Sequence, residues 1–373
     1  MSDFVFSRKP ISIAGGEGVT LEATDGTTYL DAGASYACTP VGHCHPAVVD
    51  AVTTQAADLL YVQGSYPVAP RDELHERLAT LAPGALENVW LCNSGTEANE
   101  AAIKFARSAT DRSGIVAAKR GFHGRTAGAL SATWKPKYRT PFEPLLEDVT
   151  FVPYGDGEAL TEAVDENTAA VLLEPIQGEG GIHPAPAGYL ETARAVTDTA
   201  GAALVFDEIQ TGLGRTGDRW ACEYDGVVPD VLTTAKGIAS GLPLGATVCA
   251  DWIAESAGPH GSTFSGNPLV CAAANATLEV IESEDLARRA DRLGVRLREA
   301  LADLPLEAVR GRGLLVGVDV GGGANRVLRD LALEEQVLAL PAGRRVVRLL
   351  PPLVSEDEHV DAIVAALAEV LEA

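Results

Sequence analysis

One of the six lysines in the sequence stands where its amine could act as a nucleophile. Lys236 follows the apolar run DVLTTA and precedes Gly237, so its side chain should emerge at a partly desolvated strand end. Desolvation lowers the pKa of a lysine and makes its amine reactive towards a carbonyl group. A lysine that extends its charge into solvent is the ordinary alternative, and Lys236 alone does not decide between the two.

An acid at the end of another apolar run strengthens the case for this chemistry. The run AALVFDE places Asp207 directly after a buried strand, where an unpaired carboxylate would be unfavourable. A cationic pyridine nitrogen is one partner that justifies such an acid, since a pair at about 4 Å gains ~4 kcal/mol at an effective dielectric near 20. The protonated ring could then act as an electron sink. A structural acid bound to an arginine or a helix N-terminus is the common alternative.

The segment Ser94-Gly95-Thr96-Glu97 has the features of a phosphate-binding turn. It follows the apolar run NVWLC and opens an amphipathic segment. Ser94 and Glu97 have the spacing of a capping box, and Gly95 allows the backbone to approach a ligand closely. Free amide groups at a helix N-terminus bind anions. Because an ordinary helix cap can have the same sequence, this motif alone does not establish a site.

Four further residues have side chains suited to a planar molecule that carries carboxylates. Phe122, which follows the run GIVAAK in the motif FHGRT, can stack on a cofactor ring, and Arg125 can hold a carboxylate through two hydrogen bonds. Glu179 in EPIQGEGG and Arg348 in VVRLLPP add a second acid and a second arginine. Individually, Glu179 and Arg348 could both be surface charges.

These residues fall at the ends of strands in a regular alternation of strands and helices. Seven apolar runs between residues 88 and 250 are predicted strands: NVWLC, GIVAAK, VTFVP, AAVLLEP, AALVFDE, VLTTA and GATVCA. Apolar strands joined by helical crossovers predict an α/β fold with a mostly parallel sheet, which binds ligands at its carboxyl edge, where Glu174 also lies. A hairpin is expected at Asp25-Gly26, and a helix after Pro268 leads into a smaller C-terminal lobe.

A glycine pattern in the sequence mimics a dinucleotide-binding motif. Gly212, Gly214 and Gly217 spell GxGxxG, but they do not follow a strand directly, and DRWACEYDG after them is a poor helix start. A dinucleotide fingerprint needs a strand, a tight turn and a helix in immediate succession. We therefore predict a mobile active-site loop here. A nicotinamide-dependent oxidoreductase remains the alternative from another enzyme class.

The composition limits the partners of the chain. A net charge of -23, from 52 acidic and 29 basic residues, argues against nucleic acid. No apolar run reaches the ~20 residues that span a bilayer, and the N-terminus lacks a signal-peptide pattern, so we expect a cytoplasmic protein. The cysteines are expected to be reduced and buried. No metal site is predicted in the cluster Cys38, His43, Cys44 and His45, because adjacent residues converge poorly on a tetrahedral ion.

The charge also bears on the habitat of the source organism. An acidic surface poor in lysine, with six lysines against 23 arginines, keeps a protein hydrated at high salt, where repulsion between like charges is screened. We therefore predict a halophilic source. An ordinary acidic enzyme is the alternative.

Six motifs taken in order resemble the class III (ornithine-type) aminotransferases: SGTEANEAAIKFAR, GFHGRT, EPIQGEGG, VFDEIQTGLGRTG, TTAKGIASGLPLGA and HGSTFSGNPL. The resemblance extends from about Gly18 to Pro352. It implies a pyridoxal-phosphate enzyme of fold type I, with a seven-stranded, mostly parallel sheet in a large domain and a smaller α+β C-terminal domain. The implied divisions are an N-terminal segment over 1-60 that packs with the small domain, a cofactor-binding domain over 61-265 and a small domain over 266-373.

The resemblance also implies roles around the cofactor ring. Lys236 would carry pyridoxal 5'-phosphate as a Schiff base and shuttle a proton, and Asp207 would pair with the pyridine nitrogen. Phe122 would stack on the ring, and Gln210 would lie near its hydroxyl group. Glu208 and Ile209, between Asp207 and Gln210, complete this cofactor-binding segment.

Further roles implied by the resemblance concern the phosphate group and the subunits. Gly95 and Thr96 would hold the phosphate. Thr263 would reach the same phosphate from a second subunit, so that a homodimer shares its two active sites. Ser265 departs from the glycine usual in this family and could alter the turn beside the phosphate.

For the substrate, the resemblance implies two carboxylate contacts and a switch. Arg125 would hold the α-carboxylate, with Ser262 as a further contact. Glu179 would pair with Arg348 while the amine donor is bound and release it to bind 2-oxoglutarate.

The nearest likeness is to enzymes that move the terminal amino group of an N-blocked ornithine or lysine to 2-oxoglutarate, in arginine or lysine biosynthesis. The block is either an acetyl group or a small acidic amino-group carrier protein, and it stops the aldehyde product from cyclising. The segment GASYACTPVGHCHP, which shapes the substrate entrance, departs from the sequence usual in these enzymes. The identity of the blocking group therefore stays open. Free ornithine, 4-aminobutyrate and an aminomutase reaction are the alternatives within the family, and a non-catalytic acidic partner protein is the alternative outside it.

Overall fold

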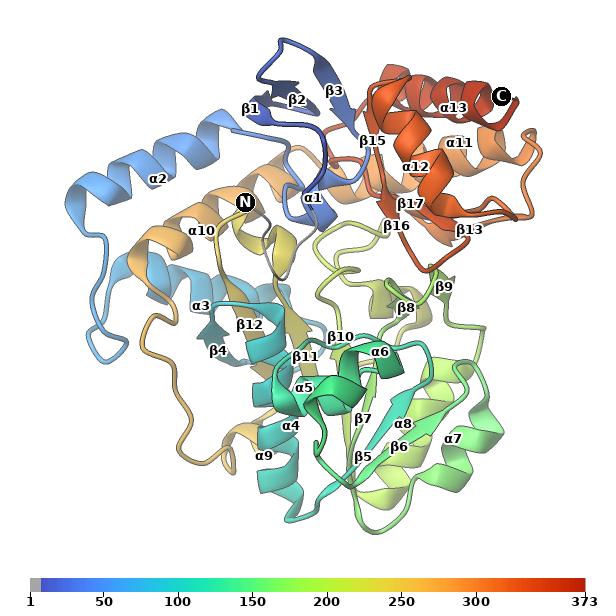
Figure 1. Cartoon of the computed structure of the whole chain (residues 1–373). Helices are drawn as coiled ribbons and strands as arrows, with labels where there is room; N and C mark the ends of the chain where they lie inside the picture. Colours follow the sequence, from blue (N-terminus) through green and yellow to red (C-terminus); the bar gives the residue numbers. More distant parts are fainter. Residues whose placement is uncertain (1–7, 373) are drawn as a thin grey trace.

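A seven-stranded sheet forms the centre of the larger lobe in the computed structural model, which describes residues 8–372 (Figure 1). The strand order is β4-β12-β11-β10-β7-β5-β6, and β12 alone among these strands runs antiparallel to its neighbours. The strands are β4 (Asn88–Cys92), β5 (Gly114–Ala118), β6 (Val149–Val152), β7 (Thr168–Leu173), β10 (Ala203–Asp207), β11 (Val231–Thr234) and β12 (Gly245–Cys249). All seven were predicted from the sequence, so the mostly parallel sheet is confirmed.

Helices cover both faces of this sheet because its central strands are apolar on both sides. In β10, Ala203 and Val205 pack in one buried cluster with residues of α4 (Gly95–Thr110). The alternate residues Leu204 and Phe206 pack in a second cluster with residues of α8 (Tyr189–Ala200). A strand buried on both faces reads as a continuous apolar run, as AALVF does.

The other helices of the larger lobe connect the strands or pack beside them. They are α2 (Pro46–Asp58), α3 (Ala69–Leu81), α5 (Ala127–Ser131), α6 (Pro136–Arg139), α7 (Gly157–Ala163), α9 (Asp251–Ala254), α10 (Pro268–Ser283) and the 3-10 turns η1 (Thr140–Phe142), η2 (Ala221–Asp225) and η3 (Lys236–Ala239). The predicted helix after Pro268 is α10, in which proline begins the first turn and Asn267 accepts a hydrogen bond from the amide of Val270 at 3.1 Å. Within residues 8–372, no helix is long and apolar enough to cross a membrane.

A second lobe at the C-terminal end combines a four-stranded antiparallel sheet with three helices (Figure 1). Its elements are α11 (Leu286–Ala302), β13 (Ala308–Arg312), β14 (Leu315–Asp319), α12 (Ala324–Leu333), β16 (Leu340–Pro341), β17 (Val346–Leu349) and α13 (Asp357–Glu372). Arg348 is therefore carried by a strand of this lobe.

The N-terminal strands join the C-terminal lobe through a further sheet. β1 (Ile13–Glu17), β2 (Thr20–Ala23) and β3 (Thr28–Asp31) are antiparallel, and the predicted hairpin at Asp25-Gly26 connects the last two. β3 pairs in parallel with β15 (Val337–Leu338), and Figure 1 shows these strands beside α12 and α13. Domain limits at residues 60 and 265 stay a prediction.

A left-handed turn follows β3. α1 (Ala34–Ala37) has φ values of 40, 48, 66 and 63°, so all of its residues lie in the left-handed region. For residues that carry a Cβ, this conformation costs roughly 1–2 kcal/mol each because the Cβ approaches a carbonyl oxygen. Such a run persists only where the surroundings hold it.

The glycine-rich segment 212–217 is a packed connection and not the mobile loop that the sequence predicted. Arg215 and Thr216 are buried, and the Arg215 guanidinium donates to the carbonyl oxygens of Leu314, at 3.0 Å, and Pro351. Gly214 and Gly217 have positive φ and approach Ala287 and Asp291 of α11. The glycines permit this close packing between the lobes. The packing accounts for the glycine pattern, so a nucleotide-binding role is not needed to explain it.

The cysteines differ from the expectation in two places. All six are free thiols, and Cys92, Cys222, Cys249 and Cys271 are buried as predicted. Cys44 is exposed, because it lies in a left-handed position just before α2, and Cys38 is only partly buried. Among residues 8–372 no three His, Cys, Asp or Glu side chains gather as metal ligands would, and His43 binds Asp31.

Candidate active site

A cavity of about 430 Å³ opens at the carboxyl edge of the parallel strands. Its lining comes from the segments after β4, β5, β7, β10 and β11, and from Cys38 in the chain before α2. The predicted residues that line it are Gly95, Thr96, Phe122, Arg125, Glu179, Asp207, Ile209, Gln210 and Lys236. Residues that are 142 positions apart in sequence, such as Ser94 and Lys236, thus meet at one edge, as expected for such a sheet.

Lys236 lies two residues beyond the end of β11, where its side chain lines the cavity. Its backbone is in the left-handed region, with φ of 46°. Burial lowers the pKa of the Lys236 amine, and the positive charge of Arg348 acts in the same direction, whereas Glu179 opposes both. The amine therefore loses its proton more easily than an exposed lysine, as a nucleophile requires.

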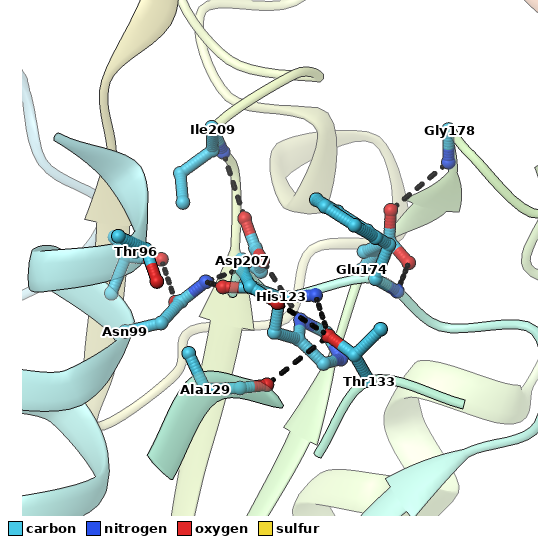
Figure 2. Close-up of polar contacts among 12 residues, drawn as sticks. Thr96, Asn99, His123, Ala129, Thr133, Glu174, Gly178, Asp207 and Ile209 are labelled. Carbon is cyan, nitrogen blue, oxygen red and sulfur yellow. Dashed lines mark hydrogen bonds and ion pairs between the residues drawn. The ribbon is translucent and has the colours of Figure 1, made fainter. Parts of the chain in front are cut away.

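The Asp207 carboxylate is buried and held by three donors (Figure 2). Oδ2 accepts a hydrogen bond from Asn99 Nδ2 at 2.8 Å and lies 2.8 Å from His123 Nδ1. Oδ1 accepts from the backbone amide of Ile209 at 3.1 Å. Asn99 is itself oriented, because it donates to the carbonyl oxygen of His123 and accepts from Thr233. These contacts fix the carboxylate at the cavity wall.

His123, which also lines the cavity, extends this network. Burial alone lowers the pKa of its imidazole, but the hydrogen bond and the charge of Asp207 outweigh burial and raise the pKa. The other ring nitrogen, Nε2, is buried and has no hydrogen-bond partner among residues 8–372. His123 belongs to the motif FHGRT, but the sequence did not indicate a role for it. Its contact with Asp207 could have been found only by knowing that β7 alone separates β5 from β10 in the sheet.

Glu174 at the end of β7 is a further buried carboxyl group of the cavity wall. Its oxygens accept hydrogen bonds from the amides of Gly178, at 3.0 Å, and Phe122, at 3.1 Å (Figure 2). Burial raises the pKa of Glu174 to about 7, a rise that the charge of His123 partly opposes. The sequence placed Glu174 at the right sheet edge but assigned it no function.

The N-terminus of α4 forms a cradle at one end of the cavity. Ser94 caps the helix, with its Oγ accepting from the Glu97 amide at 3.4 Å, while the Glu97 carboxylate accepts from the amide of Asn93 at 2.8 Å. A Cβ on Gly95 would lie 2.7 Å from Ile209 Cδ1, so the backbone passes that side chain only because the residue is glycine. The helix N-terminus supplies free amides and a positive dipole end to an anion.

Thr96 and the segment after β5 form the wall beside this cradle. Thr96 Oγ1 accepts from the amides of Arg125, at 3.1 Å, and Thr126, at 3.2 Å. The Arg125 side chain is exposed at the mouth of the cavity and stacks on Tyr138, with the guanidinium 4.3 Å from the ring centroid. Phe122 packs edge-on against the same ring, with 5.9 Å between centroids. Arg125 is thus held in place while its donors stay open to solvent.

Glu179 and Arg348 meet across the two lobes. Arg348 is fully buried, and its Nη1 lies 2.6 Å from Glu179 Oε1 and donates to Gln210 Oε1 at 2.9 Å. Burial raises the pKa of Glu179, but Arg348 and Lys236 outweigh it and the pKa is lowered, so the carboxylate is ionised. Arg348 Nε and Nη2 are buried and have no hydrogen-bond partner in the part of the chain that the structure describes. Glu179 thus covers an arginine whose Nε and Nη2 groups could still donate to a further acceptor.

Four predicted residues do not line this cavity. Arg348 lies behind Glu179 and Gln210, which do line it. The other three are Glu208, Ser262 and Thr263. Glu208 points away from the cavity, because neighbouring residues at a strand end face opposite sides, and its carboxylate accepts from Thr211 and from the Cys222 amide. Ser262 lies at the rim and accepts from Asn93 Nδ2 at 2.9 Å. Thr263 is exposed, and its carbonyl oxygen accepts from Tyr61 Oη at 2.7 Å.

The raised pKa of Glu174 predicts a pH-dependent contribution to stability. The folded protein holds the proton of the Glu174 carboxyl group more tightly than the unfolded chain does. The resulting stabilisation is present below a pH of about 4.5 and is lost as the pH rises through about 7. The melting temperature of cofactor-free Glu174→Gln, minus that of the wild type, should therefore rise from pH 5 to pH 8. Parallel melting curves for the two proteins would contradict this assignment.

Comparison with known proteins gives the family. The family model described as aminotransferase class III matches residues 6–371. Acetylornithine aminotransferase of Methanopyrus kandleri is 44% identical, covering 99% of this chain and 96% of its own length. The LysW-aminoadipate semialdehyde transaminase of Deinococcus radiodurans is also 44% identical, covering 98% of this chain and 87% of its own.

Solved structures agree with this result. Ornithine aminotransferase from Toxoplasma gondii superposes with a TM-score of 0.93 at 34% identity, over 98% of this chain and 91% of that one. Acetylornithine aminotransferase from Elizabethkingia anophelis superposes with a TM-score of 0.88 at 30% identity, over 99% and 96%. With these matches over nearly the whole length and the geometry described above, the chain belongs to the class III aminotransferase family.

Proposed function

We propose that the chain uses pyridoxal 5'-phosphate to transfer the terminal amino group of an N-blocked ornithine or lysine to 2-oxoglutarate, in arginine or lysine biosynthesis. The observation that carries the proposal is the pairing, in one cavity, of an amine with a lowered pKa and a buried, oriented carboxylate, Lys236 and Asp207. The names of two relatives support the substrate class. One is an acetylornithine aminotransferase, and the other is a LysW-aminoadipate semialdehyde transaminase.

The residues present fit this cofactor. The α4 N-terminus with Gly95 and Thr96 would hold its phosphate, Asp207 its pyridine nitrogen and Phe122 one face of its ring. Gln210 and Ile209 line the same cavity from the segment after β10. When bound, pyridoxal phosphate supplies an aldehyde for the amine and a ring that accepts electrons from the substrate carbon.

Three side chains would then handle protons and carboxylates. Lys236, whose amine gives up its proton readily, would take a proton from the substrate carbon that bears the amine and deliver it two atoms away, in a 1,3-shift. Asp207 would face the ring nitrogen and favour its protonated form, because the carboxylate is buried in the cavity wall and oriented by three polar contacts. Arg125, open at the mouth of the cavity, would hold the substrate carboxylate with Ser262 as a further contact.

Glu179 and Arg348 would let one cavity accept two unlike substrates. With the pair closed, Arg348 is neutralised and covered, which suits an amine donor that has no carboxylate at this end. When Glu179 moves aside, the spare donors of Arg348 would bind the second carboxylate of 2-oxoglutarate. Because breaking a buried pair exposes a charge, only a ligand with its own carboxylate would favour the open form.

The proposed assembly is a homodimer with shared active sites. Its support is the surface around Thr263, where Leu60, Tyr61, Tyr66 and Phe264 are exposed, and Tyr61 packs on Phe264 at 5.6 Å between centroids. An exposed apolar surface of this kind suits a partner chain. Thr263 would then reach the phosphate of the other subunit. A cytoplasmic location and a small acidic carrier protein as substrate partner belong to the same proposal.

Replacement of Lys236 tests the reaction. Lys236→Ala should lose the absorbance of a Schiff base between protein and pyridoxal phosphate and at least ~10⁴-fold of turnover, since nucleophile and base are removed together. Lys119→Ala, which replaces an exposed lysine at the end of β5, is the matched control. Pyridoxal phosphate bound through another lysine would refute the proposal.

The donor is identified by single-turnover reactions with different amines. Acetylornithine or a carrier-linked amine should react fastest, followed by free ornithine, because the relatives described above are named for blocked substrates. 4-Aminobutyrate should be slow. Reaction with 4-aminobutyrate alone would rule out the biosynthetic role.

Removal of the covering acid tests the switch. Glu179→Ala removes the acid that covers Arg348, so the ratio of the rate with glutamate to the rate with the blocked diamine should rise. We expect a rise of roughly tenfold, because one hydrogen bond to a charged group contributes about this much. Glu179→Gln keeps a hydrogen bond without the charge and should lie between Glu179→Ala and the wild type. An unchanged ratio in both variants would contradict the switch.

A halophilic source follows from the charge and is tested by salt. The net charge of -23 should make added potassium chloride stabilising, because salt screens the repulsion between carboxylates. We expect the melting temperature to rise from low to molar potassium chloride. A steady fall would show an ordinary acidic enzyme.

A further inference from the structure

We propose that Asp31 is a positioning residue that holds the left-handed turn α1 and thereby shapes the substrate end of the cavity. The proposal deepens the proposed function and rests on it in one respect, namely that this cavity binds the substrate. It assigns a task to a residue far in sequence from the motifs around Lys236.

The turn needs a support that its own residues do not provide. Ala34, Ser35, Tyr36 and Ala37 all carry a Cβ and all have positive φ. Glycine adopts this backbone without penalty, but none of the four positions is glycine. Since such a conformation persists only where its surroundings determine it, contacts from outside the turn must hold it.

Asp31 supplies those contacts. It ends β3, is 3% exposed, and its carboxylate lies under the start of the turn. Oδ1 accepts from the amide of Gly33 at 3.0 Å, and Oδ2 accepts from the amide of Ser35 at 3.1 Å. His43 Nε2 lies 2.9 Å from Oδ2 and fixes the carboxylate from the far side. A charged acceptor thus fixes two peptide planes of the turn.

The turn lies between Arg348 on one side and the segment that carries Lys236 on the other. Cys38, the residue after it, lines the cavity. The Tyr36 ring lies over the buried Arg348, with 5.4 Å from ring centroid to guanidinium carbon. On the other side the Ala37 carbonyl oxygen packs against Gly237, the neighbour of Lys236, where a Cβ would come within 3.1 Å.

The flanks of the turn are tied to the C-terminal lobe. The amide of Leu350 donates to the carbonyl oxygen of Ala32, and that of Leu353 donates to Pro40, both at 2.7 Å. These bonds lie just beyond β17, the strand of Arg348. Loss of the Asp31 contacts should therefore loosen the turn alone, displacing Tyr36 and Cys38 while the chain on either side stays in place.

This arrangement separates substrate binding from cofactor binding. None of the contacts described for the Asp31 carboxylate goes to a residue of the proposed cofactor site. A defect at Asp31 should consequently raise the KM for the amine donor and for 2-oxoglutarate. Uptake of pyridoxal phosphate at Lys236 should not change.

The test is Asp31→Asn, alone and combined with one of two glycine substitutions. The amide has a single acceptor oxygen where several donors converge, so KM for the donor should rise by roughly tenfold, with a smaller change in kcat. Ser35→Gly in the same protein should restore most of this loss, because glycine relieves the left-handed strain at φ of 48°. Ala32→Gly, at a position without positive φ, adds equal flexibility and should restore nothing.

The outcomes separate the positioning role from simple destabilisation and from the proposed function. Rescue by Ser35→Gly and not by Ala32→Gly supports the proposal. No rise in KM for Asp31→Asn, no rescue, or equal rescue by both glycines would overturn it. Absorbance of the pyridoxal-phosphate Schiff base is measured on every protein. If the wild type itself lacks that band, the proposed function fails, whereas a normal band with no rescue overturns only the role of Asp31.

Discussion

The candidate site depends on one buried anion, the carboxylate of Asp207. A carboxylate buried at the end of an apolar strand is unfavourable unless polar groups contact it. Asn99, His123 and the amide of Ile209 supply these contacts and orient the two oxygens. Each comes from a different segment, α4, the turn after β5 and the turn after β10, so the parallel sheet is what brings the donors together.

The second lobe completes the site by adding a buried cation opposite this anion. Arg348 enters on β17, and its charge is met by Glu179 from the turn between β8 (Ile176–Gln177) and β9 (His183–Pro184). Burial lowers the pKa of Lys236; of the two charges in this pair, Glu179 opposes that shift and Arg348 adds to it. The lobe that carries Arg348 is packed onto the larger one through the glycine segment 212–217, and the pairing of β3 with β15 ties the N-terminal strands to it. Substrate selection and amine reactivity thus share one electrostatic arrangement.

Much of this could be predicted from sequence because the signals were local. The apolar runs gave all seven strands, and the residues at their carboxyl ends, including Lys236 and Asp207, had to face one edge. Contacts between distant segments were not predictable in this way, as His123 with Asp207 and Glu174 with Phe122 show. Gly214 and Gly217 led to the prediction of a mobile loop, whereas in the structure they allow close packing against α11. The left-handed turn at Ala34–Ala37 had no signal, because its residues lack the glycines that mark such a backbone.

The central claim is that the Asp207 carboxylate keeps the cofactor ring nitrogen protonated. It is tested by nitrogen magnetic resonance on the wild type and Asp207→Ala, each loaded with pyridoxal phosphate labelled at that nitrogen. We expect a protonated nitrogen in the wild type at neutral pH, and an unprotonated one in the variant, which should still bind the cofactor through Lys236 but lose nearly all turnover. The same protonation state in both proteins, or an active variant, would contradict the account.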